Sequence, residues 1–221
     1  MNGENAARSL DALSISPHVS FEPMTATIRM AGEADAEQVG AIYAPYVRET
    51  AISFEVEPPT TEEMGARIAR TTRRYPWLVC TRDAEILGYA YASQHRERAA
   101  YQWSVDVSVY IDRRAWRRGI GQALYRALLR IITLQGFYNA YAGITLPNAG
   151  SVGLHEAVGF RPVGVYHAVG YKLGAWHDVG WWHLALRQPA LAPALPVDLE
   201  AVRASADWDE AVAAGRRWLR Q

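Results

Sequence analysis

The sequence predicts an α/β fold, with helices and strands mixed around one sheet, and three observations carry this prediction. Residues 104–111, SVDVSVYI, are β-branched or aromatic at most positions, which is typical of a strand. A turn with Gly119 and Gly121 follows, and apolar residues at helical spacing come next. Upstream, two apolar runs flank a short polar turn and indicate a hairpin. We therefore expect an antiparallel meander first and strands alternating with two helices afterwards.

Composition limits the possible functions. The chain has 221 residues, 50% of them hydrophobic, which suits one domain with a full core. Lys plus Arg and Asp plus Glu are both 23, so a main task in nucleic-acid binding is not expected. The single cysteine, Cys80, excludes an internal disulfide framework and a Cys-based zinc site, and we expect no metal. No apolar stretch approaches the ~18 residues of a membrane span.

The N-terminal 25 residues lack the pattern of a signal peptide. Together with the absence of an apolar span, this predicts a cytoplasmic protein without a membrane partner. The same residues are polar and broken by Pro17 and Pro23, so we expect a loose extension over 1–25. The domain is then expected over 26–188. Prolines after residue 188 predict a linker, and 189–221 would end in an amphipathic helix that docks on the domain or on a second subunit.

Periodicity and turn residues predict the elements before the central strand. Asp35 can cap the first helix, and Pro45 is expected to bend or shorten it. Acids at Glu62 and Glu63 suit the start of the second helix. The expected elements are a strand over 26–30, helices over 35–48 and 61–74, strands over 75–80 and 86–93, and a charged loop over 94–100.

Glycines punctuate the second half of the chain in the same way. Gly136 is expected to end the helix that starts at the glycine turn, and Gly159 to close a short helix. Twelve tyrosines and eight tryptophans predict an aromatic core, a subunit interface or a ring-walled pocket. The expected elements are strands over 138–145, 160–166 and 179–186, a helix over 151–158, and a glycine-rich loop over 170–178.

The turn at Gly119 and Gly121 is the first candidate for ligand binding. The first amides of a helix lack intrahelical partners and the helix dipole adds positive charge, so such an end binds phosphate or pyrophosphate. A P-loop would need Gly-Lys-Ser/Thr, and a dinucleotide fingerprint would need glycine where Leu124 stands. A shorter cradle with arginines before it remains, and the alternative is a solvated basic turn.

Six segments together resemble the GNAT N-acetyltransferases, and within them the phosphinothricin and methionine sulfoximine acetyltransferases. The glycine turn marks the superfamily, and the proline-tryptophan strand and the last segment mark the narrower group. The resemblance covers about residues 27–186 and neither tail. The segments are SFEVEPPT (53–60), YPWLV (75–79), SVDVSVYI (104–111), RRGIG (117–121), LPNAGSVGLHEAVGF (146–160) and GYKLGAWHDVGWW (170–182).

This resemblance implies a GNAT fold with a splayed central sheet, acetyl-coenzyme A as donor and an amine as acceptor. In such a fold, two neighbouring parallel strands separate, and the free backbone groups of the first can bind the pantetheine arm. The family usually has Gln or Arg where this chain has Trp116, which puts one side-chain contact in doubt. The implied donor-binding residues are Val109, Tyr110, Ile111, Arg117, Arg118, Gly119, Ile120, Gly121, Gln122, Asn148 and Ser151.

Two residues are candidates for proton transfer, because an amine nucleophile must lose a proton and the leaving thiolate gains one. Asp106 stands where relatives carry Glu, so it is implied to act as the base, directly or through a water. It could instead position the ammonium group or be a surface charge. His155 matches the position that protonates the thiolate, and the alternative is a packed helix histidine. Asn148 and Ser151 could serve as helix caps as well.

The acceptor needs its own recognition. A small amino acid with a carboxylate or phosphinate favours arginine, which can hold two oxygens, so we expect Arg96 and Arg98 to bind it. Tyr101 and Phe54 could wall the same pocket, and an exposed charged loop is the alternative. His177 and Asp178 are expected only to form a hydrogen-bonded turn.

These features together predict an N-acetyltransferase for a small glutamate-like amino acid, such as phosphinothricin or methionine sulfoximine. Direct attack in a ternary complex is favoured over an acyl-enzyme, because Cys80 is far from the donor motif. Other acceptors, such as a protein N-terminus or a polyamine, stay open, as does a sensor that binds acetyl-coenzyme A without turnover. Many relatives form dimers, and the aromatic excess suits a homodimer.

Overall fold

A seven-stranded mixed sheet organises the computed structural model, which describes residues 26–219. The expected N-terminal extension lies outside these residues. The spatial order of the strands is β1-β2-β3-β4-β5-β7-β6. The strands are β1 (Thr27–Met30), β2 (Trp77–Arg82), β3 (Glu85–Gln94), β4 (Ser104–Ile111), β5 (Asn139–Leu146), β6 (Arg161–Lys172) and β7 (Ala175–Ala185).

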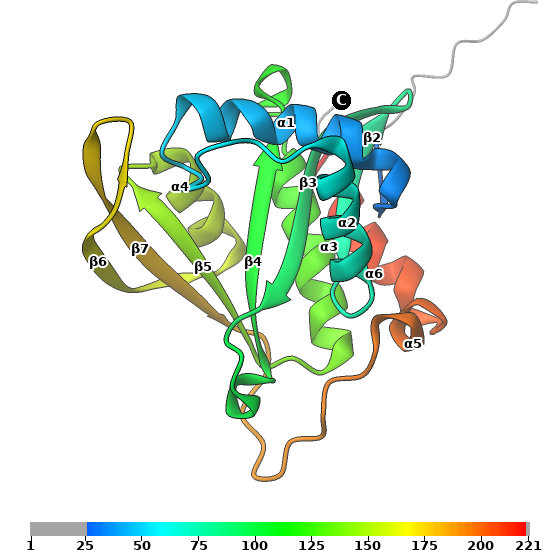
Figure 1. The fold of residues 1–221 in the computed structure, drawn as a ribbon. Helices are drawn as coiled ribbons and strands as arrows, with labels where there is room; N and C mark the ends of the chain where they lie inside the picture. The colour runs from blue at the N-terminus through cyan, green and yellow to red at the C-terminus, as the bar shows by residue number, and fades with distance from the viewer. Residues whose placement is uncertain (1–25, 220–221) are drawn as a thin grey trace, which may run out of the picture.

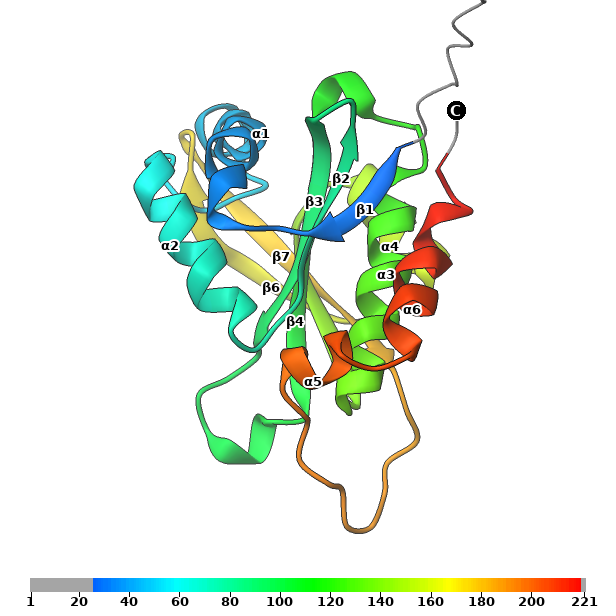
Figure 2. The same ribbon diagram turned by 90° about the vertical axis from the view of Figure 1, so that its right-hand side faces the viewer.

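Helices cover both faces of the sheet (Figures 1 and 2). On one face lie α1 (Ala36–Glu49) and α2 (Thr61–Thr72), and on the other lie α3 (Ile120–Gln135), α4 (Ala149–Val158) and the C-terminal helices. A capping box between Thr60 and Glu63 starts α2, and Gly136 ends α3 in a left-handed conformation. Over residues 26–219, no helix is both long enough and apolar enough to cross a membrane.

The first four strands confirm the expected antiparallel meander. β1 to β4 pair antiparallel in chain order. Pro45 lies inside α1, which nevertheless continues to Glu49, so the expected shortening is wrong. Alternate residues of β4 face the two layers: Val105 and Val107 join the core under α3, whereas Tyr110 packs on the α1 side.

The sheet opens between β4 and β5, as the expected fold class requires. These parallel strands are paired only over Ser104–Asp106 and Asn139–Tyr141. Beyond Asp106, β4 continues to Ile111 with β3 as its only partner among the strands of residues 26–219, while β5 pairs with β7 up to Leu146. A wedge-shaped gap therefore begins at Asp106 and widens toward the start of α3 (Figure 1).

The C-terminal third differs from the expectation in two places. Residues 170–178 are not a glycine-rich loop, because β6 and β7 form one long hairpin that turns at Leu173 and Gly174. The C-terminal segment forms two short helices, α5 (Leu199–Arg203) and α6 (Asp207–Arg216), where one longer helix was expected. Val202, Ala211 and Val212 are buried in the main core against α3, so this segment docks on its own domain.

Candidate active site

The gap between β4 and β5 is a small cavity of about 50 Å³. Its walls come from the unpaired part of β4, from β5 and from the start of α4. In an antiparallel pair only part of the backbone groups face the partner strand, so the other groups of β4 past Asp106 point into the gap. The lining includes Ser108, Val109, Tyr110, Asn148, Ser151 and His155. The structure thus brings together most residues expected to hold the pantetheine arm.

The glycine turn stands at the open end of this gap. Gly119 has φ of +78° and precedes the first residue of α3, Ile120. A left-handed residue here turns the chain sharply into the helix, so the first-turn amides of Ile120, Gly121 and Gln122 lack intrahelical partners. A Cβ on Gly121 would lie 2.8 Å from Leu154 of α4, so this glycine also permits close packing of the two helices.

Two of the four arginines beside this turn are tied to acids. Arg113 pairs with Glu49, and Arg114 pairs with Asp112 and Glu85. Arg117 and Arg118 are exposed and make no ion pair with the described residues, so their charge remains available to an anion. Free amides, a helix N-terminus and two cations fit a pyrophosphate group.

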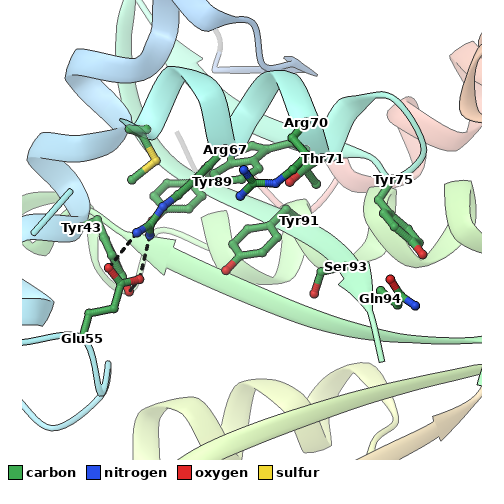
Figure 3. A pocket seen from close by; sticks show the side chains of 12 residues that line it. Tyr43, Glu55, Arg67, Arg70, Thr71, Tyr75, Tyr89, Tyr91, Ser93 and Gln94 are labelled. Carbon is green, nitrogen blue, oxygen red and sulfur yellow. Dashed lines mark hydrogen bonds and ion pairs between the residues drawn. The ribbon is translucent and has the colours of Figure 1, made fainter. Parts of the chain in front are cut away.

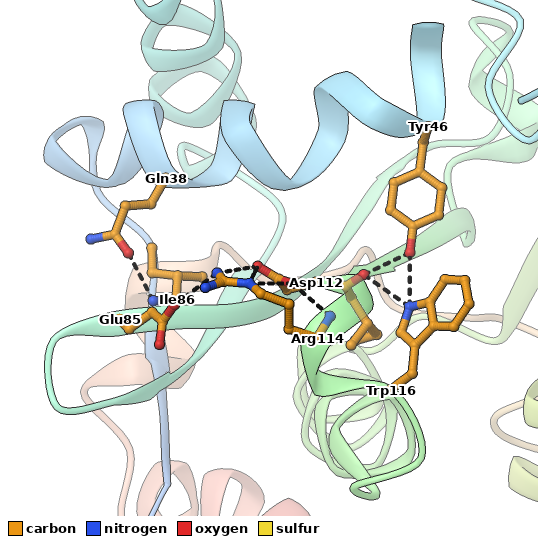
Figure 4. Close-up of polar contacts among 8 residues, drawn as sticks. Gln38, Tyr46, Glu85, Ile86, Asp112, Arg114 and Trp116 are labelled. Carbon is orange, nitrogen blue, oxygen red and sulfur yellow. Dashed lines mark hydrogen bonds and ion pairs between the residues drawn. The ribbon is translucent and has the colours of Figure 1, made fainter. Parts of the chain in front are cut away.

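Trp116 has a defined role at the end of β4. Its indole Nε1 donates to the carbonyl oxygen of Ile111 at 3.2 Å, and Tyr46 Oη donates to the same oxygen at 2.6 Å (Figure 4). The carbonyl of Ile111 is therefore occupied by protein, whereas its neighbours along the gap are not bound in this way. The tryptophan holds the strand end in place of a side chain that would reach the ligand.

Asp106 lies at the vertex of the gap and is paired with His95. The distance from His95 Nδ1 to Asp106 Oδ1 is 2.7 Å. The His95 ring stacks on Tyr141, which is the β5 residue opposite Asp106, with centroids 4.4 Å apart. Burial raises the pKa of Asp106, and the His95 hydrogen bond opposes that rise. The position of Asp106 suits a proton-transfer role, and its partner was not identified in the sequence.

His155 is buried on α4 with both ring nitrogens engaged. Nδ1 lies 2.7 Å from the carbonyl oxygen of Ser151, so Nδ1 carries a proton and donates it. Nε2 lies 2.9 Å from Tyr125 Oη on α3. Burial lowers the pKa of His155, so the ring is neutral near pH 7 and Tyr125 donates to Nε2. Asn148 caps α4 by accepting from the Ser151 amide at 3.0 Å.

The four expected acceptor residues do not form one cluster. Tyr101 lies edge-on to His95, with centroids 5.9 Å apart, and Arg96 lies over the ring of Trp181. Phe54 lies apart from them, because its ring packs against Gly170 and near His177 of the β6–β7 hairpin. Arg98 is exposed. Arg96 and Tyr101 are therefore the two that flank the vertex.

A larger cavity of about 540 Å³ lies between α2 and β3 and was missed in the sequence (Figure 3). It is on the same side of the sheet as Asp106, because Ser93 lines it and is the cross-strand partner of Asp106. Arg67 crosses its wall to bind both oxygens of Glu55, which also accepts from Tyr43. Arg70 lines it as well and makes no ion pair with the described residues.

Sequence signals could have found only part of what was missed. His95, in the HRER loop, closely follows the predicted strand over 86–93, and Asp106 lies on the predicted strand over 104–111. Antiparallel pairing of these two strands would have placed His95 near Asp106. Tyr125 gave no signal, because it reaches His155 only through packing of α3 on α4. Cys80 is fully buried, and burial raises the pKa of its thiol to about 11, so it is no nucleophile for an acyl-enzyme.

Known proteins share both the sequence and this geometry. Residues 28–181 match the family described as Acetyltransferase (GNAT) domain. The chain is 41% identical to the phosphinothricin N-acetyltransferase of Streptomyces viridochromogenes, over 81% of this chain and 97% of that one. It is 35% identical to the L-methionine sulfoximine/L-methionine sulfone acetyltransferase of Pseudomonas paraeruginosa, over 77% and 100%.

A solved structure agrees with these sequence matches. The GNAT superfamily phosphinothricin acetyltransferase of Sinorhizobium meliloti, in complex with AcCoA, superposes with a TM-score of 0.73. It is 33% identical, and the match covers 80% of this chain and 99% of that one. Among residues 26–219, no group of three His, Cys, Asp or Glu side chains is placed to hold a metal ion.

Proposed function

Because the chain belongs to the GNAT acetyltransferase family, we propose that it moves an acetyl group from acetyl-coenzyme A to the α-amine of a small glutamate-like amino acid. The observation that carries this proposal is the gap itself. The strands separate at the Asp106 carboxylate, and the next helix along the chain, α3, begins with an N-terminus suited to pyrophosphate. Acetyl-coenzyme A supplies an acetyl group already activated as a thioester.

The donor side is proposed to bind mainly through backbone. Arg117, Arg118 and the amides from Gly119 to Gln122 would hold the diphosphate at the start of α3. The free groups of Val109 and Tyr110, with Asn148 and Ser151 across the gap, would hold the pantetheine arm. Ile111 contributes less than expected, because its carbonyl is already bound to Trp116 and Tyr46. The 3.3 Å rise of a strand places Asp106 roughly 13 Å from Tyr110, so the thioester end would lie near the vertex.

The chemical step proposed is direct attack by the amine. Asp106 serves proton removal from the acceptor, and a free amide of β4 stabilises the oxyanion. His155 serves the leaving thiolate by positioning the Tyr125 hydroxyl through Nε2, while its own Nδ1 proton stays hydrogen-bonded to Ser151. The Tyr125 O–H turns from Nε2 and gives its proton to the thiolate, and the Tyr125 oxygen regains a proton from the second one that the attacking nitrogen loses. His155 and Tyr125 both line the gap, which supports their assignment to the leaving thiolate.

Acceptor selection is proposed to rest on Arg96 and Arg98 with Tyr101, and Phe54 closes the far end. The relatives named for phosphinothricin and methionine sulfoximine support a small glutamate-like amino acid as the acceptor. Arg96 lies near enough to Asp106 to lower the pKa of that carboxyl, although burial outweighs it, so a substrate carboxylate held there would keep its amine close.

A thiol-release assay with acetyl-coenzyme A across a panel of amines tests the proposal. Phosphinothricin and methionine sulfoximine should react faster than lysine peptides and polyamines. Preference for a polyamine or a peptide would contradict the acceptor class. Binding of acetyl-coenzyme A by calorimetry without thiol release from any amine would instead favour a sensor, and no binding would contradict the whole proposal.

A second copy of this chain is the proposed partner, through the β6–β7 hairpin. Large apolar side chains on this hairpin are exposed, and such patches mark interaction sites. Light scattering on the purified protein should give a dimer mass, and Tyr171→Glu with Trp176→Glu should give a monomer. A monomeric wild type at micromolar concentration would contradict this proposal. The exposed residues include Val163, Val165, Tyr166, Val169, Tyr171 and Trp176.

A further inference from the structure

The pair of His95 and Asp106 has a geometry that a lone carboxylate base does not need. The two side chains meet at 2.7 Å, and His95 is only 11% exposed, against 27% for Asp106. Asp106 accepts through Oδ1, so the proton of the shared hydrogen bond sits on Nδ1 when His95 is neutral. The neutral ring then has its lone pair on Nε2, which makes no hydrogen bond with the described residues.

The surroundings hold this ring in one orientation. Tyr141 stacks on it with an interplanar angle of 16°, while Tyr101 and Trp181 meet it edge-on at 72° and 82°. These contacts come from η2 (Ala99–Tyr101), β5 and β7, so the ring is fixed by three separate elements. Arg96, beside His95 in sequence, lies over Trp181, and its charge acts on Asp106.

Resting on the proposed acetyltransferase function, we propose that His95 Nε2 accepts the proton of the incoming amine. Asp106 is then a positioning residue, which orients His95 and balances the positive charge that His95 gains. Asp106 fixes the tautomer with a basic Nε2 and stabilises the imidazolium that forms, as a carboxylate does for histidine in other dyads. The ring also extends the reach of the short Asp106 side chain by its own length.

The proton balance of the step is complete. One N–H bond of the substrate ammonium breaks as the Nε2–H bond forms, which leaves a neutral amine and an imidazolium beside the Asp106 carboxylate. The amine lone pair attacks the thioester carbonyl, and the C–S bond breaks with its electron pair going to sulfur. The attacking nitrogen then loses a second proton, which matches the one that the thiolate gains, and His95 returns the first proton to solvent.

Ring nitrogen NMR tests the geometry without turnover. In histidine labelled with ¹⁵N, the His95 signals, identified by their loss in His95→Gln, should show the Nδ1–H tautomer near neutral pH. Asp106→Ala should remove that preference. The Nε2–H tautomer in the wild type, or an imidazolium that persists through pH 8, would overturn the proposal, because Nε2 would then have no lone pair for the amine.

The pH dependence of kcat/KM for the amine tests the role. His95→Gln should lower kcat/KM by about 10²- to 10⁴-fold, the usual range for general-base catalysis, with the KM for acetyl-coenzyme A unchanged. The rate of this variant should keep rising with pH where the wild type levels off. Added imidazole should partly restore His95→Ala. An unchanged profile in His95→Gln would overturn the proposal and leave the acetyltransferase function intact.

A second His–Asp pair in the same chain supplies the matched control. His167 Nδ1 lies 2.9 Å from Asp178 Oδ2 on the exposed β6–β7 hairpin. His167→Gln should keep the wild-type profile, because Asp178 lies opposite Leu146, five residues along β5 from Tyr141 at the vertex. If the wild type releases no thiol with any amine, the proposed function fails, and the NMR result then decides by itself whether the dyad has the geometry of a base.

Discussion

The two ends of the gap between β4 and β5 are built from different materials. The open end is made of backbone: a left-handed Gly119, the first amides of α3 and the unpaired part of β4. The vertex is made of side chains, since His95, Asp106 and Tyr141 come from three segments and fit one another. Backbone recognition tolerates a change such as Trp116, because amides stay when a side chain changes. Side-chain recognition does not tolerate such a change, because a new side chain removes the contact. A substitution at the vertex should therefore change the chemistry that a relative performs.

Substitution of Asp106 should show the largest effect, because it acts on the chemical step alone. Asp106→Asn is expected to lower kcat/KM for the acceptor by about 10²- to 10⁴-fold, with little change in the KM for acetyl-coenzyme A. Steady-state kinetics with both substrates measures this. Asp83→Asn, in the β2–β3 turn at φ of +51°, is the matched control, since Asn tolerates that conformation. A rise in the KM for acetyl-coenzyme A alone would contradict this prediction, because it would show that Asp106 serves donor binding and not the chemical step.

Substitution of His155 tests the side of the gap that α4 forms between the vertex and the open end. His155→Ala removes the acceptor of the Tyr125 hydroxyl and should lower kcat by on the order of 10²-fold, the low end for proton transfer. Binding of acetyl-coenzyme A, measured by calorimetry, should change little. Tyr125→Phe should reproduce the kinetic loss. A lower donor affinity with unchanged kcat would show that His155 only packs α4 against α3.

Gly119→Ala should affect the backbone end. An alanine at φ of +78° costs roughly 1–2 kcal/mol, so the KM for acetyl-coenzyme A is expected to rise about fivefold to thirtyfold with kcat nearly constant. Gly174→Ala is the control, since that glycine has φ of +80° and open space around its Cα, far from the gap. Equal effects on donor KM in both variants would show that the strain acts through global stability instead.

Arg96→Ala should give a smaller effect at the vertex. An exposed charge pair is worth ~1 kcal/mol at most, so the acceptor KM is expected to rise about fivefold while the donor KM stays constant. Initial rates at saturating acetyl-coenzyme A measure it. Arg203→Ala on α5 serves as the control for loss of a surface arginine. No change in the acceptor KM would leave Arg98 or Arg70 as the candidate anchor.

The smallest expected effect is on stability against pH. Burial lowers the pKa of His155 below its ordinary 6.5, so below pH 6.5 the unfolded state binds more protons and the free energy of unfolding falls. Denaturant melts at pH 7 and pH 5 should show a larger loss for the wild type than for His155→Gln. The pKa of His183 is also lowered by burial, but that contribution is present in both proteins and cancels.

Much of the fold could be predicted because its signals are local. The capping box at Thr60 and Glu63, the glycine after α3 and the apolar spacing within each helix are all read within a few residues. The β6–β7 hairpin was wrongly predicted as a loop, because its glycines are typical of loops. In the structure, strand pairing accommodates these glycines within β6 and β7. The C-terminal segment had helical spacing throughout, yet it breaks between α5 and α6 and packs on α3.

The sequence by itself determined the order of elements, the glycine turn, and the positions of Asp106 and His155 in the family pattern, because these depend on spacing along the chain. Only the tertiary structure decided which groups meet them: His95 for Asp106, and Tyr125 for His155. Each of these contacts depends on strand register or on helix packing between distant residues, and such geometry is fixed by the whole core rather than by any one segment.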